Sequence, residues 1–453
     1  MGIESCIKQF IREHISPRAF LKTLNDCTPL TCIGIEDLLI RLHSWSGANG
    51  DGLCSGQELY SEIMRVTVSP PNGMDYLLYV LCMDNQARVP NRKKTEQDKR
   101  DKIIPYPEGC WLSEAGIHFP DGYTHGEDEQ FNVLLPQPIQ IFRLCRSRHM
   151  RPLIMKFITR VLHERLFDKW NEPPPSMPVI FDSGDGFPVL WDSIKGDFAN
   201  VEYMDHSAGE SDIAALHWMQ YLMDEHHDIV LHTIDGDWIV ISMMAVEARR
   251  QWEAKHKAPR AGRVYFCPNS YSSIHQNIQC IDIDAVCDDL EKWKSSADNL
   301  ALIAVINNTD FFDKAWLTSN IGSKIILEFF RMFKRAYSFQ DVATSIETLE
   351  TFIRHLYTYA LKQYKEQCIK SDKLKERHIW NRKTVESFCA TYYSRLKLPT
   401  MDELEEVHKT LLWHWRYWTG LETRPTFEST MVAVDVTLSI TGEEALSSVP
   451  CSP

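Results

Sequence analysis

The sequence lacks the features that mark a membrane protein, a secreted disulfide scaffold or a zinc finger. No run approaches about 18 uninterrupted apolar residues, so we expect neither a membrane span nor a membrane partner. The N-terminus, MGIESCIKQF, has no apolar signal-peptide core. The 13 cysteines include no CxxC pair. Structural zinc is therefore not expected, and the cysteines suit reduced thiols in an intracellular protein.

Basic residues are also outnumbered, with 49 Lys and Arg against 62 Asp and Glu. The 453 residues carry a formal net charge of −13, which argues against a general binder of polyanions. Metal-binding carboxylates add negative charge themselves, so this balance still permits a nucleic-acid enzyme. Basic residues cluster in residues 88–102, with seven Lys or Arg against three acids, and in residues 143–166. Such runs are usually solvated surface, but these two could also hold a phosphate backbone.

Buried strands that alternate with helices predict an α/β fold with a mostly parallel sheet flanked by helices. We expect strands in CIGIED, LYVLCMD, PVIFD, DIVLHTI and LALIAVINN, and a turn-rich segment from GDGFPVLWD to NVEYM. We expect helices over 143–166, after AGESD and after SNIG. The predicted core covers residues 1–335, with an insertion at about 85–177 that is irregular over 103–140. A helical region follows over 336–428, where WHWRYW suits helix packing better than base stacking, and a flexible tail covers 429–453.

Acidic residues recur where the predicted strands end or helices begin. In open α/β sheets, ligands bind beyond the carboxyl ends of the strands. Clustered carboxylates repel one another, and Mg²⁺ or Mn²⁺ would relieve that repulsion. Two such ions about 4 Å apart can activate water in phosphodiester hydrolysis. Each acid also has an ordinary interpretation as a helix cap or turn residue. The candidates are Glu36 (or its neighbour Asp37), Asp84, Glu210, Asp212, Asp235, Asp237 and Asp310.

The segment LHTIDGDWIVIS, residues 231–242, has two interpretations. An Asp-Gly pair between apolar runs is a strong signal for a β-hairpin. A parallel strand that ends in two metal-binding carboxylates, Asp235 and Asp237, would give the same pattern.

The order of these motifs resembles that of the flap endonuclease/XPG-type 5′ nuclease superfamily, and more distantly that of the Xrn-type 5′→3′ exoribonucleases. The resemblance covers roughly residues 1–335 and rests on MGI, CIGIED, LYVLCMD, NRKKTEQDKR, AGESD, TIDGDWIVIS, NNTDFF and SNIGSKII. It implies a PIN-like nuclease core, a helix–two-turn–helix element that grips duplex DNA, and two Mg²⁺ or Mn²⁺ ions. In its light, the segment 231–242 is a strand end in a metal site.

The resemblance also assigns roles to particular residues. The acids named above would hold the metals. Lys93, Lys94 and Arg100 would stabilise the scissile phosphate. Contacts with nucleic acid would come from Gly2, Arg88, Arg92, Asn320, Gly322 and Lys324. The implied activity is structure-specific 5′ cleavage of flap, branched or 5′-ended DNA in the nucleus or another DNA-containing compartment.

The sequence departs from the family pattern at several positions. Glu36 is one methylene longer than the usual Asp, and Asn320 and Asn308 replace glycines. We find no sliding-clamp motif of the Gln-x-x-hydrophobic-x-x-aromatic kind. Two alternatives therefore stand beside the DNA nuclease: an Xrn-like exoribonuclease acting on RNA, and a catalytically silent nuclease-like scaffold that serves as a binding or assembly subunit.

Overall fold

The structure is a computed structural model, and it divides the chain into two compact units. One unit spans residues 17–285 with 423–431, and the other spans 1–16, 286–422 and 432–453. The predicted domain boundaries near residues 335 and 428 stay predictions. The residues that the structure describes are 19, 32–39, 41, 53–54, 61–63, 65, 76–84, 111–113, 116–118, 139–140, 150–167, 177–183, 188–192, 197–201, 210–223, 227–260, 262–268, 280–308, 321, 323–333, 336–375 and 400–419.

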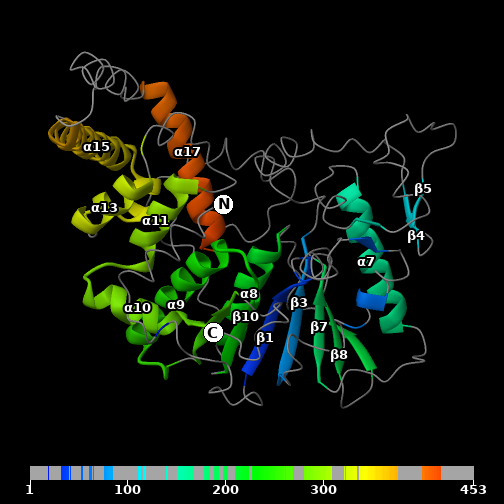
Figure 1. Cartoon of the computed structure of the whole chain (residues 1–453). Coiled ribbons are helices and arrows are strands. Elements are labelled where there is room, and N and C mark those ends of the chain that lie inside the picture. The colour runs from blue at the N-terminus through cyan, green and yellow to red at the C-terminus, as the bar shows by residue number, and fades with distance from the viewer. Residues whose placement is uncertain are drawn as a thin grey trace, which may run out of the picture. The chain divides into compact units, whose positions relative to one another are not determined.

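An eight-stranded sheet, in the order β12-β11-β10-β1-β3-β7-β8-β9, forms the centre of the first unit (Figure 1). Its five central strands run parallel, and three antiparallel strands lie at the edges. The α/β class predicted from the sequence is therefore confirmed. The central strands are β11 (Val264–Cys267), β10 (Asp228–His232), β1 (Cys32–Asp37), β3 (Leu78–Cys82) and β7 (Val179–Asp182). The edge strands are β12 (Ile281–Asp282), β8 (Val189–Asp192) and β9 (Asp197–Asn200).

The central strands are buried runs of aliphatic and aromatic residues, as expected where helices cover a parallel sheet. Helix α8 (Ser211–Met223) packs against β1, β3 and β10. Helix α9 (Asp237–His256) packs against α8 and β11. The described residues also form helix α7 (Met150–Phe167), which contacts β4 (Trp111–Ser113).

Two small antiparallel pairs accompany the main sheet. Strand β4 pairs with β5 (Gly116–His118), and β2 (Leu53–Cys54) pairs with β6 (Ile139–Gln140). Strands β4, β5 and β6 lie within residues 103–140, which the sequence predicted to be irregular. Strands β8 and β9 likewise form a hairpin in the segment predicted to be rich in turns.

The second unit is helical in its described part. It contains α11 (Ala297–Asn308), α13 (Ser323–Phe333), α14 (Phe339–Thr344), α15 (Ile346–Lys375) and α17 (Met401–Trp418), and α10 (Ile283–Lys292) joins the two units in sequence. Helix α17 begins at a capping box made by Thr400 and Glu403. Trp413, Trp415 and Trp418 are buried, which confirms that WHWRYW serves helix packing.

One strand prediction is wrong. Residues 301–308, within LALIAVINN, form helix α11 and not a strand. A short, wholly apolar run does not by itself distinguish a buried strand from a buried helix. Local hydrogen bonds favour the helix, because Ser296 N–H donates to Asn299 Oδ1 (3.0 Å) and Asn299 N–H donates back to Ser296 Oγ (3.1 Å). Separately, none of the described helices has the length and apolarity that a membrane crossing requires.

Candidate functional site

The carboxyl ends of β1 and β3 meet the first turn of α8, and a serine joins them there. Ser211 Oγ donates a hydrogen bond to Asp37 Oδ2 (2.9 Å), and Ser211 N–H donates to Asp84 Oδ1 (2.8 Å). Both carboxylates are buried, with 6% of each residue exposed. The N-terminal end of a helix favours negative charge. The start of α8 therefore fixes two of the predicted acids next to each other.

An arginine from α7 reaches the same carboxylates. The Arg151 guanidinium forms an ion pair with Asp84 Oδ2. The side chain of Arg151 is 16% exposed, and that of Asp84 is 8% exposed. Arg151 belongs to the predicted basic helix over 143–166. This ion pair brings a positive charge from that helix to an acid at the carboxyl ends of the parallel strands.

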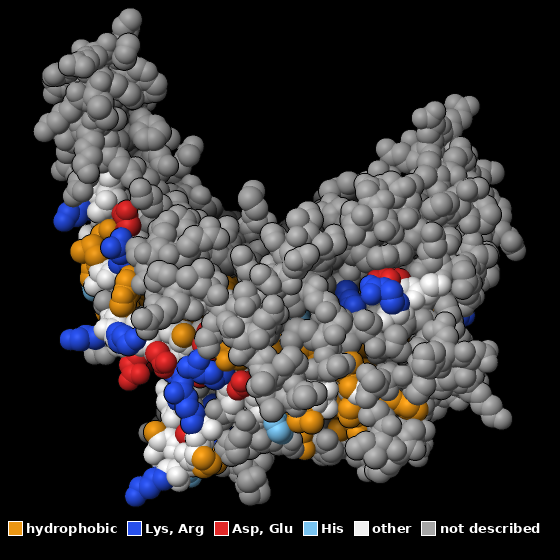
Figure 2. Space-filling view, turned by 60° about the horizontal axis from the view of Figure 1, so that its bottom comes forward, with side chains coloured by type: hydrophobic (Ala, Val, Ile, Leu, Met, Phe, Trp, Pro, Cys, Tyr) orange, Lys and Arg blue, Asp and Glu red, His pale blue; other side chains and the backbone are white. Residues whose placement is uncertain are grey.

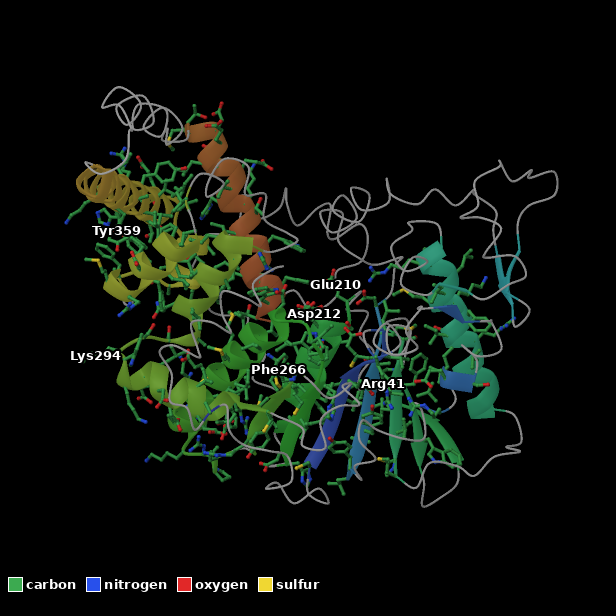
Figure 3. All side chains as sticks on the ribbon, viewed as in Figure 1. Arg41, Glu210, Asp212, Phe266, Lys294 and Tyr359 are labelled. Carbon is green, nitrogen blue, oxygen red and sulfur yellow. The ribbon has the colours of Figure 1, made fainter. Side chains whose placement is uncertain are left out.

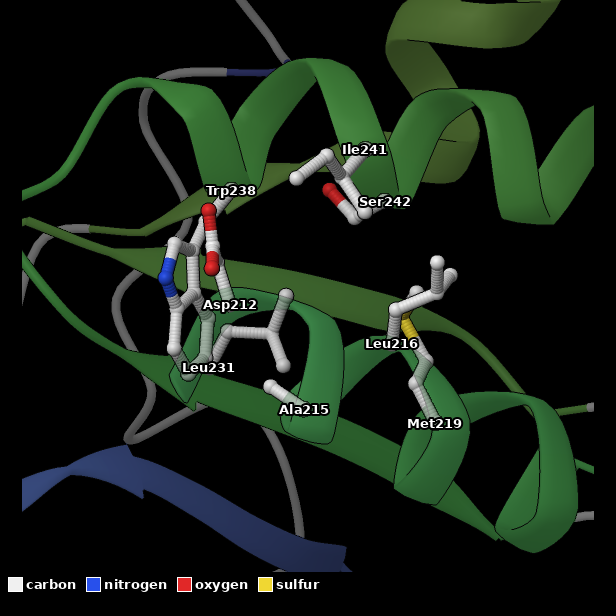
Figure 4. Close-up of a pocket in the computed structure, with 8 residues that line it drawn as sticks. All are labelled: Asp212, Ala215, Leu216, Met219, Leu231, Trp238, Ile241 and Ser242. Carbon is white, nitrogen blue, oxygen red and sulfur yellow. The ribbon is translucent and has the colours of Figure 1, made fainter. Parts of the chain in front are cut away.

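Two further predicted acids flank Ser211 on α8. Glu210 is fully buried, and Asp212 is 8% exposed. Figure 3 shows both beside the upper ends of β10 and β1. Asp212 also lines a small pocket between α8, α9 and β10, where its carboxylate lies beside the indole ring of Trp238 (Figure 4). Ser242 and apolar side chains such as Leu216 and Met219 line the rest of this pocket.

The segment 231–242 is a strand, a loop and a helix. Strand β10 ends at His232 and pairs in parallel with β1, and α9 begins at Asp237, so the hairpin interpretation is wrong. Asp235 is exposed and accepts a hydrogen bond from Asp237 N–H (3.1 Å). Both residues follow the carboxyl end of β10, next to that of β1.

Glu36, the immediate neighbour of Asp37, lies in a different cluster. Successive residues of a strand point to opposite faces of the sheet. Glu36 is fully buried and accepts a hydrogen bond and ion pair from Arg41 Nη1 (3.0 Å), which also donates to Tyr79 OH (3.2 Å). Of the two alternatives for the first-strand acid, Asp37 is the one that the structure brings to Asp84 and Ser211.

A histidine and two tyrosines complete the cluster around Glu36. The Tyr76 hydroxyl and His232 Nε2 lie 2.6 Å apart and share a hydrogen bond. The rings of Tyr76 and Tyr79 stack with centroids 5.9 Å apart. This stack leaves room only for glycine at position 34, because a Cβ there would lie 2.9 Å from Tyr79 Cδ2 and 3.0 Å from Tyr76 Cδ2. Burial, together with the positive charge of Arg41, lowers the pKa of His232 from 6.5 to about 3.

Sequence reasoning missed three residues near the candidate site: Ser211, Arg151 as a partner of Asp84, and Asp182. Asp182 ends β7 and accepts a hydrogen bond from Trp218 Nε1 of α8 (2.7 Å). Burial, with the charges of Asp182 and Asp37, raises the pKa of Cys82 well above its usual range, so this thiol stays protonated. Asp182 has the same signal as the predicted acids, a carboxylate that ends an apolar strand.

The fit of a metal ion can be judged from the donors. Asp37, Asp84, Glu210, Asp212 and Ser211 offer oxygen atoms only, which suits Mg²⁺ or Mn²⁺. Within the described residues, however, no group of three or more His, Cys, Asp or Glu side chains already has an arrangement that could hold a metal ion. The donor chemistry therefore fits a hard cation. In the present arrangement, however, Asp84 forms an ion pair with Arg151.

Several predicted site residues lie outside the described residues. They include the basic segment over 88–102 and residues of the predicted helix–two-turn–helix element that precede α13. The side chain of Lys324, which is within α13, is also outside the description. The residues concerned are Gly2, Arg88, Arg92, Lys93, Lys94, Arg100, Asp310, Asn320 and Gly322.

No protein-family model matches the chain, and no curated protein sequence does either.

Proposed function

We propose that this protein is a divalent-metal-dependent 5′ nuclease that hydrolyses phosphodiester bonds in DNA. The observation that carries the proposal is the link made by Ser211 between Asp37 and Asp84. Through this link, acids from β1, from the end of β3 and from the start of α8 lie together at the carboxyl ends of the parallel strands. Ligand sites of open α/β sheets lie beyond the carboxyl ends of the strands.

The carboxylates Asp37, Asp84, Glu210 and Asp212 would hold the metal ions, with Asp235 and Asp237 at the adjacent strand end. When bound, such an ion supplies a water of lowered pKa and offsets negative charge on the phosphate. Ser211 would orient Asp37 and Asp84 through its two hydrogen bonds. A hydrogen-bonded partner of this kind fixes the direction of a ligand and tunes its affinity.

Arg151 would position the substrate. Its guanidinium holds Asp84 in the present arrangement and has the planar fork that recognises phosphate oxygens. Transfer of Arg151 from Asp84 to a phosphate would free that carboxylate for a metal ion and place a positive charge on the substrate.

A second candidate is a catalytically silent scaffold, and the two arginine pairs favour it. Glu36 is paired with Arg41 and Asp84 with Arg151, so these carboxylates are already neutralised without a metal. A PIN-like core that lost its metals would be stabilised by such pairs.

The test is cleavage of a 5′-labelled DNA flap in the presence of Mn²⁺, with single-stranded DNA and RNA in the same panel. The Asp235→Ala/Asp237→Ala variant serves as the control. If the protein is the proposed nuclease, cleavage should disappear in this variant while its circular dichroism spectrum stays unchanged. Preferred cleavage of RNA would indicate the exoribonuclease. Absence of cleavage on all three substrates, or normal turnover by the variant, would contradict the proposal and favour the scaffold.

A further inference from the structure

A group of basic residues lies at the amino ends of the parallel strands, opposite the carboxyl ends that carry the candidate site. It runs from the second half of α9 to the start of β11. Residues 249–263 contain six Lys or Arg, in a chain whose net charge is −13. We call this group the basic edge, and its members are Arg249, Arg250, Lys255, His256, Lys257, Arg260 and Arg263.

Backbone contacts locate the basic edge at the amino ends of the parallel strands. Arg263 directly precedes β11, and its N–H donates to the carboxylate of Asp228, the first residue of β10 (2.7 Å). Figure 2 turns the lower side of Figure 1 forward and shows Lys and Arg side chains gathered on that face. Helix α9 has 20 residues, so it spans about 30 Å between Asp237 at the candidate site and this edge.

Buried carboxylates hold the arginines of this edge in place. Asp284 accepts hydrogen bonds at Oδ1 from both Arg250 Nη2 (2.8 Å) and Arg260 Nη2 (3.2 Å). Asp282 Oδ2 accepts from Arg263 Nη1 (2.8 Å). Asp282 and Asp284 are 1% and 4% exposed, whereas the side chains of Arg260 and Arg263 are 54% and 38% exposed. The two carboxylates therefore lie inside, and they hold the guanidinium groups of Arg260 and Arg263 at the surface.

The positive charge exceeds what the local structure requires. Lys255 and His256 complement the negative end of the α9 dipole, as basic residues in a last turn often do. Lys257, Arg260 and Arg263 lie beyond that turn. Six Lys and Arg face four carboxylates here, those of Asp228, Glu253, Asp282 and Asp284, which leaves two positive charges in excess.

We propose that the basic edge is a binding surface for the phosphate backbone of a nucleic acid, separate from the metal-binding edge. Lys255, Lys257 and Arg260 are exposed and Arg263 is partly exposed, and positive charges spread along the chain in this way fit a row of phosphates better than a single phosphate group. The ring of Trp252 lies under the Arg249 guanidinium (4.3 Å to the centroid) and beside His256 (4.5 Å between centroids). Because these side chains occupy the ring, contact would be with backbone phosphates and independent of base sequence.

An anionic membrane is a poorer fit for the same charges. Surface helices that bind membranes add large apolar side chains that enter the bilayer. Among the described residues, the large hydrophobic side chains that are exposed are Leu77, Tyr221, Ile234, Met332 and Met401, and none belongs to the basic edge.

The test is binding of the full chain to a fluorescent 20-base-pair duplex and to a single-stranded RNA. It is followed by anisotropy between 50 and 200 mM NaCl, with EDTA present so that metal-dependent cleavage does not occur. The variant is Lys255→Gln/Lys257→Gln/Arg260→Gln, in which Arg250 still pairs with Asp284. Loss of three phosphate contacts should lower the slope of log K against log salt by about 3 and the affinity at 0.1 M NaCl by at least about tenfold.

The matched control removes three exposed positive charges from the helical unit, Arg331→Gln/Arg354→Gln/Lys362→Gln. It should bind within about twofold of wild type if the effect is specific to the basic edge. A second variant, Lys255→Glu/Lys257→Glu, touches no ion pair given above for this edge and should weaken binding further. Unchanged binding by the variants, equal loss in the control, no nucleic-acid binding by wild type, or binding to phosphatidylserine vesicles alone would each overturn the proposal. Because EDTA is present, failure of the nuclease proposal would leave this result unaffected.

Discussion

Two neighbouring residues at the end of β1 have opposite surroundings. Asp37 faces α8, where Ser211 joins it to Asp84. Glu36 faces the other side of the sheet, where Arg41 neutralises it beside Tyr79. A buried ion pair of this kind is costly to break. On the face of Asp37, carboxylates gather as they would in a ligand site. On the face of Glu36, the carboxylate is paired with a buried arginine.

The largest expected effect concerns activity. Replacing Asp37→Asn should lower flap cleavage by about a thousandfold, because a catalytic metal contributes several kcal/mol to stabilising the transition state. Single-turnover rates at saturating Mn²⁺ measure this effect. The Glu36→Gln variant is the matched control on the other face and should keep its rate within about threefold. Loss of activity in Glu36→Gln but not in Asp37→Asn would reverse our assignment of the two faces.

The next effect concerns stability. The Glu36→Gln variant leaves the Arg41 charge buried without its counter-charge, which should cost about 3 kcal/mol of unfolding free energy. Urea denaturation followed by circular dichroism measures the loss. A double variant, Glu36→Gln/Arg41→Met, should recover part of it, because both charges are then removed. A loss below about 0.5 kcal/mol in the single variant would show that this pair contributes no more than an exposed surface pair does.

The stability of the Glu36 face should depend on pH, because His232 belongs to the cluster around Glu36. The folded protein holds the pKa of His232 at about 3, below its ordinary value of 6.5. The unfolded chain therefore binds a proton below about pH 6.5 that the folded protein does not bind. Stability from this group is complete above pH 6.5 and falls by about 1.4 kcal/mol per pH unit as the pH drops toward 3. Denaturation midpoints of wild type and His232→Gln between pH 7 and 4.5 test this, and equal slopes would refute it.

The smallest effect concerns Ser211. Replacing Ser211→Ala removes the hydrogen bond to Asp37 but keeps the backbone donor to Asp84. Unfolding free energy should fall by about 1 kcal/mol, and affinity for Mn²⁺ by about tenfold if Asp37 is a metal ligand as proposed, since Ser211 would then orient it. Titration calorimetry with Mn²⁺ gives the affinity. Ser242→Ala is a control for loss of a buried hydroxyl, because, among the described residues, Ser242 Oγ donates to the Ile239 carbonyl in its own helix.

The sequence predicted four of the five central strands and several helices because their signals are local. Buried aliphatic runs that end in acids, such as LYVLCMD, leave few other interpretations, and four of them are parallel strands in the structure. LALIAVINN failed because an apolar run has no periodicity, and its capping residues Ser296 and Asn299 precede the apolar stretch. Strand β11 was missed because VYFC is short and follows a basic loop.

The candidate site was predictable only as a set of acids on strand ends. Choosing between Glu36 and Asp37 requires knowing which face of β1 meets α8, and that depends on tertiary packing. The pairing of Arg151 with Asp84 joins positions 67 residues apart, which no spacing in the sequence encodes. The contact of Ser211 with both carboxylates likewise depends on how α8 lies across β1 and β3.

The most direct test of the central claim, that the Asp37 face binds divalent ions, is thermal unfolding with and without millimolar Mn²⁺. The comparison is among wild type, Asp37→Asn/Asp84→Asn and Glu36→Gln. If Mn²⁺ is present at about 100 times its dissociation constant, mass action adds about 2.7 kcal/mol, and Tm should rise by about 5 °C. We predict this rise in wild type and Glu36→Gln and its absence in the double variant. No rise in wild type, or an equal rise in all three proteins, would contradict the metal site.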